Sequence, residues 1–201
     1  MTTRRQFVLW LPAPVLLAAC DRPQVSSRKF HAMDISSVDW GRGFELTDHT
    51  GRRRTLADFR GKVVMVFFGF THCPDICPTA MAEMAQVVRR LGADGARVQA
   101  LFITVDPERD TPAVLAKYVT AFHPSFLGLR GSSEETARIA QEFKVHFQLN
   151  KDAPGADAKR YMVDHSTGIF IYDADGKLRL YAGSNRSVER MTSDVRRLLR
   201  A

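Results

Sequence analysis

The apolar positions of the chain include two nearly unbroken runs, at 63–68 and 98–105. Such runs predict strands that are buried on both faces of a sheet. Segments with capping residues and helical spacing of apolar positions follow the runs and also close the chain. The predicted helices cover 78–91, 112–122, 133–143 and 187–200.

Shorter apolar segments predict two hairpins. One pairs 44–47 with 54–56 around a glycine-containing turn, and the other pairs 168–172 with 178–181 around 173–177. Strands that alternate with helices indicate one α/β domain, a mixed sheet flanked by helices with an N-terminal hairpin and a C-terminal hairpin plus helix. The polar segment 150–160 is expected to be a mobile loop.

The N-terminus has the pattern of an export signal. Arg4 and Arg5 precede an apolar stretch at 7–19, which is shorter than the roughly 20 residues that a membrane-spanning helix needs. The twin arginines are compatible with export in the folded state (Tat) and equally with an ordinary Sec signal, and the pattern does not decide between them. Residues 1–19 are therefore interpreted as an export signal.

The signal ends in Leu17-Ala18-Ala19-Cys20, which resembles the lipobox of a bacterial lipoprotein. Cys20 is the expected lipidation site, 20–37 the expected tether and 38–201 the folded domain. The expected location is the extracytoplasmic face of a bacterial cell membrane, on the periplasmic side. Thiols in that compartment tend to be oxidised.

The charge is moderately basic. The formal net charge is +7, or +5 without Arg4 and Arg5. Arginine clusters at 52–54 and 196–200 are interpreted first as a solvated basic face, with docking to anionic lipid or an acidic partner as the alternative. No motif for nucleic-acid binding or for a small-molecule substrate is evident, so neither is expected as a partner.

The remaining two cysteines, Cys73 and Cys77, lie in GFTHCPDICPT between the first long strand and its helix. A cysteine pair at this position indicates a thioredoxin-like arrangement. A disulfide here would close a loop of only three intervening residues, and so would stabilise the fold little. A redox pair and a metal site remain open as functions.

The proline pattern places the start of the helix near Pro78, with Cys77 at its cap. The positive end of the helix dipole is then expected to favour thiolate on Cys77. Thiolate serves disulfide exchange, and it is also a soft ligand for Cu(I). Asp75, between the cysteines, either tunes the site or is an acidic residue favoured near a helix N-terminus.

A copper site would also use imidazole, which suits Cu(II). His165 is the strongest candidate because it precedes a strand, in an approach loop that would face the cysteine turn. Neighbouring Asp164 would orient it or merely form a turn. The other histidines are interpreted as loop, turn or partly buried residues; they are His31, His49, His72, His123 and His146.

Three ordered motifs, GKVVMVFFGFTHCPDICPT, FITVDPERDTP and VDHSTGIFIYDADGKL, resemble the Sco/SenC proteins of cytochrome c oxidase synthesis. The resemblance spans about 38–200. It implies a thioredoxin-like fold with inserted elements and copper ligation by Cys73, Cys77 and His165, with Cu(I) mainly on the two thiolates. The implied role is delivery of copper to the CuA centre of cytochrome c oxidase subunit II, or reduction of the cysteines there. The implied partners are that subunit or its assembly factors, and the membrane through the lipid.

Other functions stay open beside the metallochaperone. A thiol:disulfide oxidoreductase would use Cys73 and Cys77 as its catalytic pair and would depend little on His165. A peroxidase of the peroxiredoxin type would need a threonine and arginine constellation that the sequence does not supply. Asp106 and Asp110, in the second motif, are interpreted as strand-end and capping residues. A redox-inert binding module would leave the cysteine pair unexplained.

Overall fold

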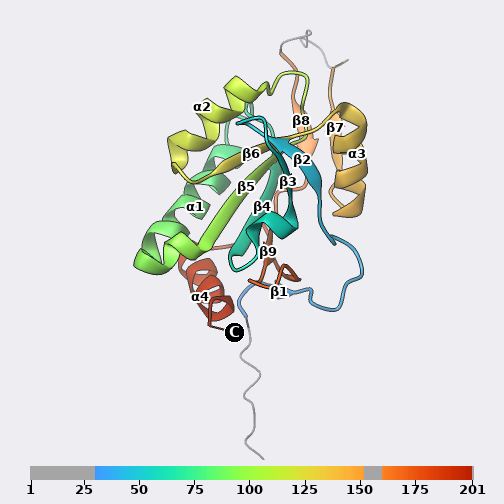
Figure 1. Cartoon of the computed structure of the whole chain (residues 1–201). Coiled ribbons are helices and arrows are strands. Elements are labelled where there is room, and N and C mark those ends of the chain that lie inside the picture. Colours follow the sequence, from blue (N-terminus) through green and yellow to red (C-terminus); the bar gives the residue numbers. More distant parts are fainter. Residues whose placement is uncertain (1–29, 152–159, 201) are drawn as a thin grey trace, which may run out of the picture.

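The structure is a computed structural model, and it describes residues 30–151 and 160–200. Its centre is an eight-stranded mixed sheet in the order β1-β10-β9-β4-β5-β6-β2-β3 (Figure 1). The strands β4 (Val63–Gly69) and β5 (Val98–Thr104) lie parallel in the middle and are buried along their whole length. Burial on both faces explains the two apolar runs.

The other strands complete the sheet on either side. β6 (Leu127–Arg130) is parallel to β5, and β9 (Ile169–Tyr172) is antiparallel to β4. The two predicted hairpins are present as β2 (Glu45–Asp48) with β3 (Arg53–Thr55), and β9 with β10 (Leu178–Ala182). A mixed sheet flanked by helices is the fold class that the sequence predicted.

The helices cover both faces of the sheet. Helices α1 (Ile76–Arg90), α2 (Pro112–Phe122) and α4 (Val188–Leu198) form one layer, in which α1 contacts both of the others. Phe143, which follows α3 (Ser133–Glu142), packs against Phe68. Short 3-10 turns cover Leu56–Phe59 and Gly92–Arg97. None of the helices in these described ranges is long and apolar enough to span a bilayer.

The start of α1 differs from the prediction. The helix begins at Ile76, after Asp75 at the N-cap, so Cys77 lies in its first turn and not at its cap. Pro78 lacks an N–H, which costs nothing here because the first N–H groups of a helix have no acceptor within the helix. Its ring would clash with a helical carbonyl four residues earlier, but that residue, Pro74, lies before the helix. Asp75 makes no capping hydrogen bond through its side chain.

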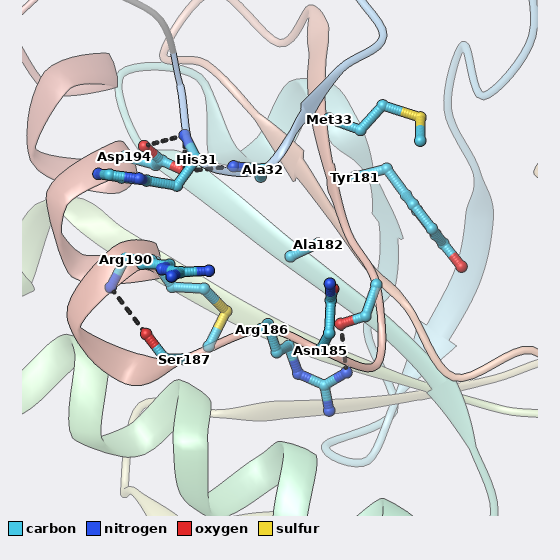
Figure 2. Close-up of a pocket in the computed structure, with 12 residues that line it drawn as sticks. His31, Ala32, Met33, Tyr181, Ala182, Asn185, Arg186, Ser187, Arg190 and Asp194 are labelled. Carbon is cyan, nitrogen blue, oxygen red and sulfur yellow. Dashed lines mark hydrogen bonds between the residues drawn. The ribbon is translucent and has the colours of Figure 1, made fainter.

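The beginning of the folded domain also differs from the prediction, which placed residues up to 37 in a tether. Strand β1 (Met33–Asp34) pairs with β10, and the Ile35 side chain is buried. The buried Asp194 carboxylate of α4 accepts the backbone N–H groups of His31 and Ala32 (Figure 2). Hydrogen bonds and burial therefore extend the domain to about residue 31. The predicted signal, Cys20 and most of the 150–160 loop lie outside the described residues.

Two elements at the upper end of Figure 1 were not predicted. β7 (Phe147–Leu149) and β8 (Val163–His165) form a separate two-stranded antiparallel sheet. Strands of three residues carry too little periodicity to be recognised in a sequence unless a turn signal joins them into a hairpin, as for β2 and β3. β8 matters most, because its last residue is His165.

Candidate metal centre

The cysteine loop connects β4 to α1 and brings the two thiols together. Cys73 is half-buried and Cys77 is fully buried, and both are free thiols. The backbone N–H of Cys77 points at the Sγ atom of Cys73 over 3.5 Å. Gly69 ends β4 directly beside them, and a Cβ atom there would lie 2.8 Å from Cys77 Sγ. The sheet therefore needs a glycine at this point to admit the sulfur.

His165 reaches the same point from the other side. Its ring packs edge-on against Phe67 and Phe70, with centroids 6.0 and 5.8 Å away. The Nδ1 atom lies 2.9 Å from the carbonyl oxygen of Ser166. A carbonyl oxygen can only accept, so Nδ1 carries the ring proton, and Nε2 presents its lone pair to Cys77 Sγ at 3.3 Å. Ser166, and not Asp164, therefore sets the tautomer; Asp164 accepts a hydrogen bond from Asn150.

Together the three side chains form a compact set of donor atoms. The sulfurs of Cys73 and Cys77 and a ring nitrogen of His165 all lie within 4.8 Å of one another. Across residues 30–151 and 160–200, these are the His, Cys and acidic side chains that gather closely enough to hold a metal ion. Two thiolates suit Cu(I), and the added imidazole suits Cu(II).

The electrostatics of the site differ from the prediction for Cys77. Burial raises the pKa of the Cys77 thiol well above its usual range, and the neighbouring Cys73 and Asp110 add to the rise. Burial also lowers the pKa of His165. The burial of Cys77 thus outweighs the effect of the helix dipole on its pKa. The Cys77 thiol keeps its proton and faces a neutral imidazole. A bound cation takes the place of the thiol proton.

The other histidines are not members of this cluster. His31 is at the α4 junction, His49 Nδ1 accepts the N–H of Gly128, and His123 contacts Ser125. His146, predicted to be partly buried, is exposed just before β7. His72 adjoins Cys73, and its ring contacts the hydroxyl of Thr71. The hollow in Figure 2, of about 330 Å³, is lined by none of the three ligands.

Sequence reasoning missed the role of the second motif. Asp106 and Asp110 are both fully buried, and Thr111 rather than Asp110 caps α2. Asp110 accepts hydrogen bonds from Thr71 in the cysteine loop. The available signal was topological: β4 and β5 are parallel, so the segments that follow them meet at one edge of the sheet.

A family model described as SCO1/SenC matches residues 33–200. Among curated proteins, the mitochondrial SCO2 homolog of Bos taurus is 48% identical over 79% of this chain and 59% of its own length. That of Homo sapiens is 45% identical over 96% of this chain and 70% of its own length. The chain thus spans about three fifths of the length of the bovine relative.

Solved structures agree in fold. ScoI of Bradyrhizobium japonicum, solved with copper bound, is 38% identical with a TM-score of 0.69, over 78% of this chain and 97% of that chain. Apo Sco1 of Thermus thermophilus is 35% identical with a TM-score of 0.74, over 86% and 99%. The region of similarity therefore covers nearly the whole of the Thermus chain.

Two more distant structures share 25% identity. One is a SCO1/SenC family lipoprotein of Bacillus anthracis, with a TM-score of 0.67 over 85% of this chain and 99% of that chain. The other is BsSco, described as having a disulfide switch, with a TM-score of 0.60 over 79% and 92%. With the family model spanning nearly all of the described domain, and relatives close to half identical, this chain belongs to the SCO1/SenC family.

Proposed function

We propose that this protein binds copper through Cys73, Cys77 and His165 and delivers it to the CuA site of cytochrome c oxidase subunit II, or prepares that site. The observation that carries the proposal is the convergence of two sulfurs and one imidazole nitrogen within 4.8 Å. Copper-bound structures of family members with 34–38% identity support the choice of metal. BsSco, described as a member of the Sco family of cytochrome c oxidase assembly proteins, connects the family with oxidase assembly.

The geometry suits a carrier that must both hold and release its cargo. Cys73 is partly exposed and can exchange a metal ion with an incoming thiolate, whereas Cys77 is fully buried. Cu(I) can remain on the two sulfurs, and His165 supplies the third ligand that Cu(II) favours. Three ligands leave one side of the ion open for a partner's ligand.

The test is copper stoichiometry and absorption of the reduced domain starting at residue 30, compared with Cys73→Ser, Cys77→Ser and His165→Ala. One copper per chain, with Cu(II)–thiolate absorption lost in all three variants, is the expected result. A domain that binds no copper while keeping its fold would overturn the proposal. The solved Thermus relative, matched over 99% of its chain, indicates that this domain folds alone.

A second candidate function is thiol:disulfide exchange by Cys73 and Cys77. The contact of the Cys77 N–H with Cys73 Sγ, and the disulfide switch described for BsSco, favour it. His165→Ala separates the two functions, because an oxidoreductase would keep most of its exchange activity while a copper carrier would lose Cu(II).

We further propose that the chain is exported to the extracytoplasmic side of a bacterial membrane and anchored by a lipid on Cys20. The support is the lipobox pattern and the existence of a family lipoprotein in Bacillus anthracis. Curated relatives carry mitochondrial names, so the compartment needs a direct test. Mass spectrometry of the protein purified from its own membranes would detect a lipid on Cys20, and Cys20→Ala would release the protein.

A further inference from the structure

The segment between β5 and α2 contacts both halves of the copper site. It contains Asp106, Arg109 and Asp110, and both carboxylates are inaccessible to solvent. Buried carboxylates are costly unless they accept several hydrogen bonds. Each of these two has its own set of donors, and the two sets come from different parts of the site.

Asp110 contacts the loop that carries Cys73 and Cys77, which we call the cysteine arm. Its carboxylate accepts the N–H of Thr71 at 3.1 Å and the hydroxyl of Thr71 at 2.6 Å. The hydroxyl of Thr104, in the buried end of β5, donates to the same carboxylate at 2.5 Å. Thr71 lies two positions before Cys73, so these bonds fix the turn from which the first sulfur projects.

Asp106 and Arg109 contact the segment 161–165, which ends in His165 and which we call the histidine arm. Asp106 accepts the hydroxyl of Tyr161 at 2.7 Å and the Nε–H of Arg109. Arg109 in turn donates through Nη1 to the backbone carbonyl of Tyr161 at 2.9 Å, and its guanidinium lies 3.6 Å from the centre of that ring. Tyr161 is four positions before His165 and leads directly into β8.

Two further observations support the contacts of the histidine arm. Burial and the bond to Asp106 raise the pKa of Tyr161 to about 12, so its hydroxyl stays protonated and donates. The Arg109 guanidinium also lies 5.8 Å from the Phe70 ring, which packs edge-on against His165. Arg109 therefore contacts the chain that enters β8 and also one wall of the histidine ring.

We propose that Asp106, Arg109 and Tyr161 are positioning residues for His165, and that Asp110 is a positioning residue for the cysteine loop. The inference rests on the proposed function, because it concerns the same site. Its consequence is a division by oxidation state: disturbing the histidine arm weakens Cu(II) binding, while disturbing the cysteine arm weakens Cu(I) binding as well.

The histidine arm is tested with Tyr161→Phe, which removes one hydroxyl and keeps the ring under Arg109. The matched control is Tyr172→Phe, since the Tyr172 hydroxyl is also buried but donates to Gly41 away from the site. We expect Tyr161→Phe to weaken Cu(II) binding about tenfold and to leave Cu(I) binding within about twofold, as is typical for outer contacts of metal ligands. Equal losses for both ions, or the same loss in the control, would overturn the proposal.

The cysteine arm is tested with Asp110→Asn and with the milder Thr71→Val. The control is Asp194→Asn, which changes a buried carboxylate that accepts backbone N–H groups at the α4 junction. We expect both loop variants to weaken Cu(I) and Cu(II) binding about tenfold and the control to weaken neither. If Thr71→Val folds normally and binds both ions like the wild type, the assignment of Asp110 is wrong.

A metal-free measurement separates this inference from the proposed function. Nuclear magnetic resonance of the copper-free domain should show altered His165 ring resonances in Tyr161→Phe, and altered alkylation of Cys73 in Thr71→Val. Copper-free spectra that are unchanged at His165 in Tyr161→Phe would overturn the positioning role. Failure of the wild type to bind copper would instead overturn the proposed function and leave this structural test intact.

Discussion

The Nε2 atom of His165 lies 3.3 Å from the Sγ atom of Cys77, although the two residues are 88 positions apart in the sequence. One comes from the first turn of α1 and the other from the end of a three-residue strand. In this contact a buried thiol donates toward the unprotonated nitrogen of a neutral imidazole.

The two cysteines should differ sharply in reactivity. Cys77 is fully buried with a pKa raised by burial, whereas Cys73 is half-exposed. Because the thiolate is the reactive form, we expect Cys73 to be alkylated by iodoacetamide at least about tenfold faster than Cys77. Peptide mass spectrometry on a time course of the reduced, copper-free domain measures both rates, and equal rates would contradict the structure.

Replacing Gly69 by alanine should disturb the site through packing alone. The added Cβ atom would lie 2.8 Å from Cys77 Sγ and 2.9 Å from the rings of Phe67 and Phe102. We expect a loss of about 1–3 kcal/mol in the free energy of unfolding, together with weaker copper binding. Urea unfolding measures the first effect. Gly183→Ala is the control, because its Cβ would meet no atom closer than 3.8 Å.

The N-terminal strand should contribute to stability. A domain that starts at residue 37 lacks β1 and Ile35, and its Asp194 carboxylate loses the N–H groups of His31 and Ala32. Against a domain that starts at residue 30, we expect a loss of about 2 kcal/mol in the free energy of unfolding, from one lost apolar side chain and the lost hydrogen bonds of one carboxylate. Equal midpoints in urea would show that residues 30–36 behave as a tether after all.

Acid should remove a defined part of the stability through Asp48. Desolvation acts to raise the pKa of this buried carboxyl, but hydrogen bonds from Thr50, Arg54 and Arg52 outweigh it and lower the pKa to about 2. Because the pKa falls on folding, the stabilisation is complete above about pH 4 and is lost as the pH drops from about 4 to about 2. It amounts to about 2 kcal/mol.

Asp48→Asn tests this dependence on pH. The variant should be less stable than the wild type at pH 7, and the difference should shrink between pH 4 and pH 2. Asp39→Asn, which changes an exposed carboxylate, is the matched control. A constant difference between Asp48→Asn and wild type across this range would rule out the linkage.

The sequence predicted most of the sheet and the identity of the candidate ligands, for two different reasons. β4 and β5 carried a clear signal because burial on both faces leaves no polar position in the run. His165 was ranked by its place before a strand, and the full ligand set followed from resemblance to a family. Neither the apolar runs nor the resemblance predicted that Cys77 is fully buried.

What escaped prediction depends on contacts between distant segments. The tether was extended to residue 37 because a two-residue strand has no periodicity, and only its pairing with β10 reveals it. Thiolate was expected on Cys77 because the helix dipole is a local property, whereas burial by Gly69 and its neighbours is not. Asp106 and Asp110 were interpreted as strand-end and capping residues, because their hydrogen bonds with Tyr161 and Thr71 join segments that are far apart in the sequence.

The two ends of the large sheet are formed by its shortest strands, β1 with two residues and β3 with three. β3 also carries Arg53 and Arg54, one paired with Glu135 and the other with Asp48. Short, charged edges offer little backbone for another molecule's strand to continue. A strand of another molecule therefore finds little backbone to pair with at either end of the sheet, which disfavours edge-to-edge aggregation at high protein concentration.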